Sequence, residues 1–237
     1  MQITRTAPPR QPMNRTMTTA YPSLSHAQRI PLAAEIHSRP FLRLEAPEAI
    51  THLAVYRASE SGSRSAHGPN QHALLAALCG HFGVAAPNVT ANHFYHDFGR
   101  FRLKWECHTE FATYTFTEKA APGPSLADAF ARMPLAYLPQ AWILGLHGHL
   151  MSAAHVLLER GAADPAVLQE SFAGSHLVGS RVMQGGEVWT DFAIQSDGFS
   201  RFVLRDVEMR AQQAGRLAQR VLEIDTYRMM ALLGLPA

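Results

Sequence analysis

Tryptophan and arginine side chains that accompany acids stand out in both halves of this chain. Arginine pairs with carboxylates through its planar fork and stacks on indole rings, so such residues suit a cleft for an anionic or aromatic ligand. The same groups would equally suit an internal ion-pair lattice that holds the two halves together. The ligand-binding candidates are His37, Arg39, Trp105, His108, Glu110, Arg181, Trp189, Asp191 and Arg201.

A second candidate chemistry is general acid–base catalysis at a predicted hairpin, where His108 and Glu110 are two residues apart. Turns often carry such groups, although the same pair could simply cap the hairpin. No Gly-x-Ser-x-Gly elbow or other nucleophile is evident.

The 13 histidines raise a metal hypothesis, but a metal site needs three or four converging ligands. His93 and His96 would point to opposite faces of a strand. The sequence therefore predicts no metal and no cofactor, and leaves open whether the chain is an enzyme. The alternative function is a metal-assisted hydrolase that uses His93, His108, Glu110 and Asp191.

Composition limits the class of protein. The 237 residues are 47% hydrophobic and 17% charged, which is typical of a folded chain with a sizeable core. A formal net charge of +2 is too small to predict nucleic-acid binding. Two cysteines, Cys79 and Cys107, exclude a disulfide framework and favour a reducing, cytoplasmic location.

The chain divides into a tail and two similar units. Residues 1–29 contain arginines, threonines and prolines but no acid and no apolar period, which predicts a disordered tail without a secretory signal. Residues 30–135 and 136–237 form the two predicted units of one intimate globule. Both run through the same order of elements, so we predict an α+β fold, with two tandem βαβββα units as an internal duplication.

Hydrophobic period and turn residues place the elements. Leu74, Leu75 and Leu78 recur at helical spacing, whereas Phe101, Leu103 and Trp105 alternate as in a half-buried strand. We expect antiparallel sheets covered by helices. The predicted helices are 30–39, 74–82, 126–133, 165–172 and 208–233, and the predicted strands are 51–58, 92–98, 100–107, 111–116, 151–158, 177–183, 188–194 and 199–204.

Residues 141–158 contain no Asp, Glu, Lys or Arg, and their length approaches that of a membrane span. The histidines His147, His149 and His155 within this stretch would be costly at bilayer depth. We therefore predict a buried strand and no membrane segment.

The last predicted helix carries a wide apolar stripe. Leu217, Val221, Ile224 and Ala231 lie on it, with Leu222, Met229 and Leu232 as neighbours, opposite Arg216, Gln219, Arg220 and Glu223. Core packing accounts for its first half. Past Tyr227 the apolar residues would be exposed, which predicts a homo-oligomer or a protein partner.

Eight short runs resemble, in this order, a bacterial family known as domain of unknown function 3422, described as predicted membrane-anchored proteins. The likeness covers residues 31–237. The runs are Glu35 to Phe41, Asn92 to Phe94, Phe101 to Glu106, His108 to Phe111, Leu177 to Arg181, Trp189 to Phe192, Asp197 to Arg201 and Glu223 to Met230.

The resemblance implies a bacterial module at the inner face of a membrane and implies no known reaction. Family members usually have Ala where Ser38 stands and Arg where Cys107 stands. They also continue into further helical sequence and a membrane segment, so we expect this chain to be a truncated form or a short paralogue. The sequence thus favours a non-catalytic ligand-binding or protein-interaction module.

Overall fold

The computed structural model describes residues 26–38, 41–56, 70–108, 111–120, 125–172, 176–182, 185–210 and 212–233. The chain separates into two compact units, Met1–Pro40 and Phe41–Ala237. In the first unit the described residues form helix α1, Arg29–Ser38. Most of the predicted disordered tail 1–29 lies outside the described residues.

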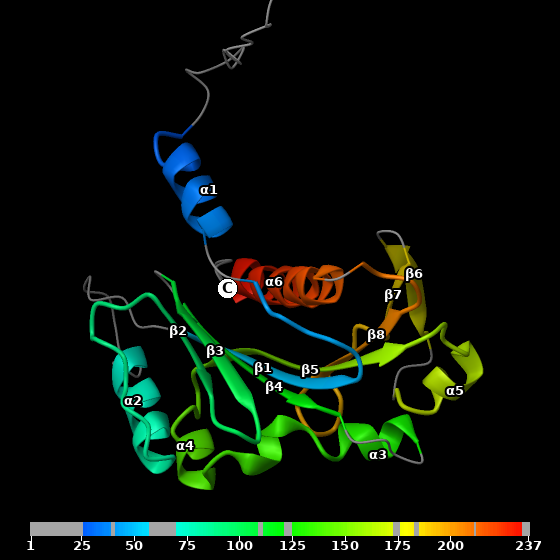
Figure 1. The fold of residues 1–237 in the computed structure, drawn as a ribbon, viewed down its shortest axis with the longest axis horizontal. Coiled ribbons are helices and arrows are strands. Elements are labelled where there is room, and N and C mark those ends of the chain that lie inside the picture. The colour runs from blue at the N-terminus through cyan, green and yellow to red at the C-terminus, as the bar shows by residue number, and fades with distance from the viewer. Residues whose placement is uncertain are drawn as a thin grey trace, which may run out of the picture. The chain divides into compact units, whose positions relative to one another are not determined.

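One eight-stranded sheet organises the second unit, in the order β2-β3-β4-β1-β5-β8-β7-β6 (Figure 1). Its strands are β1 Glu48–Tyr56, β2 His93–Asp97, β3 Arg102–Cys107, β4 Phe111–Lys119, β5 Leu150–Arg160, β6 Val178–Val182, β7 Gly186–Thr190 and β8 Ser200–Asp206. The helices of this unit are α2 Gln71–His81, α3 Leu126–Phe130, α4 Gln140–Leu144, α5 Pro165–Gln169 and α6 Gln213–Leu233, with a 3-10 turn η2 at Pro134–Tyr137.

Strand β4 shows how the sheet separates two interior layers. Successive side chains of a strand point to opposite faces, and here Thr113, Thr115 and Thr117 alternate with Tyr114 and Phe116, all of them buried. The aromatic residues face α2 and α4, and the threonines face the opposite side. Both faces of the strand are therefore interior, with different polarity.

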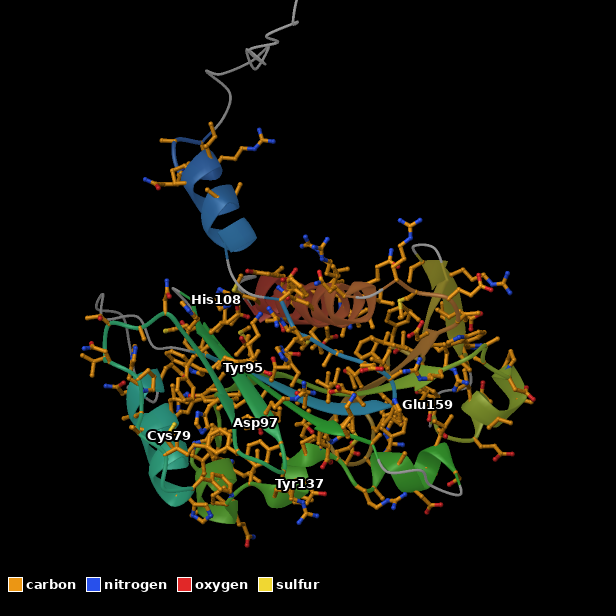
Figure 2. The ribbon with its side chains drawn as sticks, in the orientation of Figure 1. Cys79, Tyr95, Asp97, His108, Tyr137 and Glu159 are labelled. Atoms are coloured by element: carbon orange, nitrogen blue, oxygen red, sulfur yellow. The ribbon has the colours of Figure 1, made fainter. Side chains whose placement is uncertain are left out.

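The face covered by α2 and α4, called the aromatic face below, has an apolar core. Asn70 caps α2 by accepting hydrogen bonds from the backbone N–H groups of His72 and Ala73, which fixes where the helix begins. Cys79 on this helix is buried, and Figure 2 shows its place on α2. The core of this face includes Leu53, Leu75, Leu78, Leu103, Trp105, Tyr114, Phe116 and Trp142.

The opposite face, called the α6 face, is covered by α6 and by the segment 41–46 (Figure 1). Leu42 and Leu44 of that segment pack with Leu217 and Leu222 of α6. Gly215 permits the close approach, because a Cβ at this position would stand 1.7 Å from the Leu42 carbonyl oxygen. A larger residue would force the helix and the segment apart.

The α+β class and the long terminal helix are confirmed. The strands form one mixed sheet rather than separate antiparallel ones, because β8 runs parallel to β5. On the two sides of the central β1·β5 pair the strands follow in corresponding order, β4, β3, β2 beyond β1 and β8, β7, β6 beyond β5. The corresponding pairs differ in direction, because β4 runs antiparallel to β1 whereas β8 runs parallel to β5. The halves therefore share element order and differ in strand polarity, and the duplication and the domain division at residue 135 stay predictions.

Two details of the predicted helices are corrected. The helix expected over 126–133 ends at Phe130, and the chain continues through η2 into α4. On α6 the predicted stripe is buried at Leu217 and Leu222 but not at Ile224, which is 68% exposed. Leu232 is 55% exposed, as expected for the residues past Tyr227. Asp225 and Thr226 point inward instead, since buried hydrogen-bonding groups of the sheet lie beneath them.

Candidate functional site

The structure brings Arg181 and Trp189 together at one end of the sheet, around the carboxylate of Glu187. Trp189 Nε1 donates a hydrogen bond to Glu187 Oε2 at 3.0 Å, and Arg181 Nε lies 3.6 Å from Glu187 Oε1. The Trp189 ring covers Gly179, where a Cβ would stand 2.3 Å from the ring. Because Arg181 is almost fully exposed, this pair adds little to stability.

Asp191 lies in the loop between β7 and β8, and Arg201 lies in β8. Asp191 accepts hydrogen bonds from the Ala193 backbone and the Gln195 side chain. Arg201 pairs with Asp197 at 3.0 Å, and its guanidinium carbon lies 4.8 Å from the centre of the Phe130 ring. These contacts organise local structure.

The pKa of Asp197, in the same loop, lies below its usual value. Partial burial raises this pKa, but the backbone hydrogen bond from Phe199 and the Arg201 charge outweigh burial and lower it. The carboxylate is thus held ionised as a partner of Arg201.

The candidates of the first half lie apart from these groups. Trp105 is fully buried on the aromatic face, edge-on to Tyr114 and His72. His108 follows β3 and stacks on Phe111 at 4.4 Å between ring centres. The His37 side chain, Arg39 and Glu110 lie outside the described residues. The predicted ligand-binding residues are therefore spread over both halves of the sheet in the described part, and their role stays a prediction.

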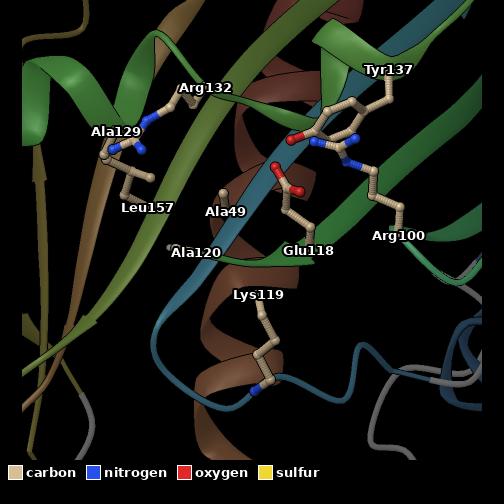
Figure 3. Close-up of a pocket in the computed structure, with 9 residues that line it drawn as sticks. All are labelled: Ala49, Arg100, Glu118, Lys119, Ala120, Ala129, Arg132, Tyr137 and Leu157. Carbon is tan, nitrogen blue, oxygen red and sulfur yellow. The ribbon is translucent and has the colours of Figure 1, made fainter. Parts of the chain in front are cut away.

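A pocket of about 220 Å³ opens at the edge of the aromatic face, and its lining includes none of those candidates (Figure 3). Strands β4, β1 and β5 form its floor, because Ala49 is paired with both Glu118 and Leu157. The turn before β3, the end of α3 and η2 form its walls. Its lining residues are Ala49, Arg100, Glu118, Lys119, Ala120, Ala129, Arg132, Tyr137 and Leu157.

The polar groups of this pocket come from separate elements. The Arg100 guanidinium stacks on the Tyr137 ring, 3.7 Å from its centre, beside Glu118 (Figure 3). Arg132 lies across the hollow, and its Nε donates to the Asp128 carbonyl oxygen. Two guanidinium groups therefore flank one carboxyl group and one phenol.

Lys119 lines the pocket, but its charged group lies outside it. Its ammonium group points away from the hollow in Figure 3, donates to the Glu45 carbonyl oxygen at 2.7 Å and lies 3.2 Å from a Glu48 carboxylate oxygen. Arg100, Arg132 and Glu118 then leave the pocket with one net positive charge when all three are ionised.

Burial raises the pKa of Glu118, while a hydrogen bond from Tyr137 and the charge of Arg100 act in the opposite direction. A carboxyl group with a raised pKa in a pocket is a feature of many binding and catalytic sites. This group is thus able to accept a hydrogen bond from a bound molecule, and also to donate one when protonated.

Sequence reasoning did not single out Arg100, Glu118, Arg132 or Tyr137. Arg100 follows the turn glycine Gly99, and Glu118 occupies an aromatic-face position of β4 where its neighbours Tyr114 and Phe116 are apolar. The signal in the sequence was an acid on the same face of the strand as these two aromatic residues. Arg132 falls within the helix predicted over 126–133, whereas Tyr137 lies beyond it, where no element was predicted.

The metal hypothesis gains no support from the described part of the chain, where no three His, Cys, Asp or Glu side chains are grouped to hold a metal ion. His93 bonds its neighbour Asn92, and His108 stacks on Phe111. Among the described residues, no helix has the length and apolar content needed to cross a membrane.

Comparison with known proteins shows to which family the chain belongs but names no reaction. No curated protein and no solved structure matches the chain. One family model matches residues 24–237, a range that includes the whole sheet, the pocket and α6. Since that is most of the chain, this protein belongs to the family described as protein of unknown function, DUF3422.

Proposed function

We propose that this protein is a non-catalytic binding module for a small carboxylate that enters the Arg100–Arg132 pocket. The observation that carries the proposal is the presence of two guanidinium groups on opposite sides of one hollow. Arginine is the side chain best suited to bind a carboxylate through two parallel hydrogen bonds.

Charge and size narrow the ligand class. One net positive charge suits a monoanion better than a dianionic phosphate, because Glu118 would repel the second charge. At roughly 30 Å³ for each water-sized group, a volume of about 220 Å³ holds about seven such groups. A hydroxy acid or an amino acid fits, since its hydroxyl or ammonium group could donate to Glu118.

The test is calorimetric titration of the intact chain with acetate, lactate, alanine and inorganic phosphate. We expect lactate or alanine to bind more tightly than acetate, and phosphate to bind least. Arg132→Gln should weaken binding at least about tenfold, because a hydrogen bond to a charged group contributes about 1.5–3 kcal/mol. The matched control is Arg220→Gln, an exposed arginine on α6, which should leave affinity unchanged.

Two outcomes would contradict the proposal. One is the absence of binding by all four compounds at millimolar concentration. The other is an equal loss of affinity in Arg132→Gln and Arg220→Gln, which would indicate non-specific attraction of anions.

A second candidate function is self-association through the outward side of α6. Ile224, Tyr227 and Leu232 are exposed there, and Arg220, Glu223 and Arg228 give the surface both signs of charge. A surface with both charges can pair with a second copy across a two-fold axis. Light scattering should show a dimer that Leu232→Glu dissociates, and an unchanged mass would exclude this interface.

We place the module in the cytoplasm, associated with the inner face of a membrane through other molecules. Cys79 and Cys107 are both buried and form no disulfide with each other, which agrees with a reducing compartment. Fractionation of cells that express the chain, followed by a salt wash of the membranes, tests this location. Export of the chain would contradict it.

A further inference from the structure

The two halves of α6 contact the sheet through different chemistry. Residues 213–222, the proximal half, bury Leu217, Ala218 and Leu222 against Ile50 and Val156 of the sheet. Residues 223–233, the distal half, place Asp225 and Thr226 inward. The proximal half is therefore held by apolar burial, and the distal half lies over a polar part of the same face.

Hydrogen bonds connect the distal half to three strands. His52 of β1 bonds Thr115 of β4 through Nδ1 at 2.8 Å and Thr226 of α6 through Nε2 at 3.1 Å. Ser152 of β5 donates to Asp225 at 2.7 Å. All five side chains are buried, so these bonds replace water that the groups would otherwise bind.

Apolar contact adds less to the distal half. Met230 packs against Ala54, Phe111 and Met151, and Tyr227 meets the edge of the Phe111 ring. Ile224 and Leu232 point outward. Detachment of this half would uncover the small apolar cluster of Ala54, Phe111 and Met151 and would return its polar partners to water.

Two of the basic groups around His52, Lys104 and His108, oppose its protonation. Lys104 of β3 is buried and pairs with Glu106 at 2.9 Å, and His108 follows the same strand. On α6, Asp225 is bound by Ser152 and lies 3.9 Å from Arg228. Burial, then the charges of Lys104 and His108, lower the pKa of His52 to about 3.

We propose that the distal half of α6 is an acid-released clasp, which stays docked while His52 is neutral and detaches as a unit when His52 takes up a proton. The proximal half and the sheet remain folded, because apolar burial holds the one and the strand ladder holds the other. The proposal does not depend on the pocket or on its ligand.

The expected pH dependence of the opening equilibrium of the distal half follows from proton linkage. In the open form His52 meets water and titrates near 6.5, whereas in the docked form it titrates near 3. The open form therefore binds more protons at every pH between these values. The opening equilibrium should rise about 25-fold from pH 7 to pH 5.

Hydrogen exchange of the full chain, read by mass spectrometry as protection factors corrected for intrinsic rates, measures this opening directly. We expect the protection of residues 223–233 to fall about 25-fold between pH 7 and pH 5, with residues 213–222 and β1 much less affected. His52→Gln keeps two polar groups and removes the titration, so its distal half should show no such fall.

The matched control is His155→Gln. His155 is the other buried histidine with a lowered pKa, but it lies on the aromatic face, bonded to Thr51. This variant should keep the pH response of the distal half. Thr226→Val, which removes one bond from the helix side, should raise distal opening about fivefold already at pH 7.

Three results would overturn the proposal. Equal loss of protection in both halves of α6 would mean that acid unfolds the whole unit. A pH response that persists in His52→Gln, or one that disappears in His155→Gln, would assign the effect to another group.

Discussion

The two faces of the sheet are built from the same strands and differ in what they bury. Tyr114 and Phe116 of β4 pack into the aromatic face, whereas Thr113 and Thr115 of the same strand lie on the α6 face. Apolar burial is insensitive to pH. Hydrogen bonds of a buried histidine depend on its protonation, so acid acts on the α6 face through His52 and on the aromatic face through His155.

The largest effect is expected from a cavity in the aromatic face. Phe116 is fully buried beside Phe101 and Trp142. Phe116→Ala should lower the free energy of unfolding by about 3–5 kcal/mol, because large-to-small changes in a core lose burial and leave a void. Urea denaturation measures the change. A cost below about 1 kcal/mol would mean that this face is not the main source of stability.

Overpacking the α6 face should have the next largest effect. A Cβ at Gly215 would collide with the Leu42 carbonyl oxygen, so Gly215→Ala should cost about 2–3 kcal/mol. Gly80→Ala on α2 is the control, since a Cβ there meets nothing within 4 Å and should stabilise the helix by up to about 1 kcal/mol. Equal effects of the two variants in urea denaturation would show that segment 41–46 does not pack against α6.

Acid should weaken both faces through one histidine each. Burial is the main cause that lowers the pKa of His52 to about 3 and of His155 to about 4. The unfolded chain binds more protons between those values and 6.5. The free energy of unfolding is therefore highest above pH 6.5 and falls as the pH falls. At pH 5 each histidine should have lowered it by about 2 kcal/mol.

Urea denaturation of the two single variants at pH 7.5 and pH 5.0 separates the contributions. His52→Gln and His155→Gln should each remove about half of the pH dependence. If one variant removes all of it, only one face responds to acid, and the comparison between the faces changes accordingly.

The smallest effect is expected on the outward side of α6. Ile224→Ala should change the free energy of unfolding by less than about 0.5 kcal/mol, because this side chain is 68% exposed. Leu222→Ala, two residues earlier and buried, should cost about 2–3 kcal/mol. Thermal unfolding of the two variants would reveal a different rotation of the helix if the order were reversed.

Much of the local structure could be predicted because the signals are local. Alternation of Phe101, Leu103 and Trp105 predicted β3, and leucines at helical spacing predicted α2. The order of strands in the sheet and the parallel β5·β8 pair could not be predicted, because strand pairing joins residues far apart in the chain. Periodicity also does not say whether Ile224 or Thr226 faces the sheet.

The pocket shows the same limit. Arg100, Glu118, Arg132 and Tyr137 meet only because β4, η2 and the turns around them converge in space. None of these residues forms a motif along the chain, whereas the conspicuous Trp and Arg residues made local contacts such as Trp189 with Glu187.

The sequence by itself determined the α+β class, most element positions, the long terminal helix and the family likeness, because composition and hydrophobic period act over short distances. The tertiary structure alone decided which polar groups share a site and which side of α6 is buried. The reason is that a buried polar group is stable only beside a partner. The partners of Thr226 and Asp225 come from strands 70 or more residues away.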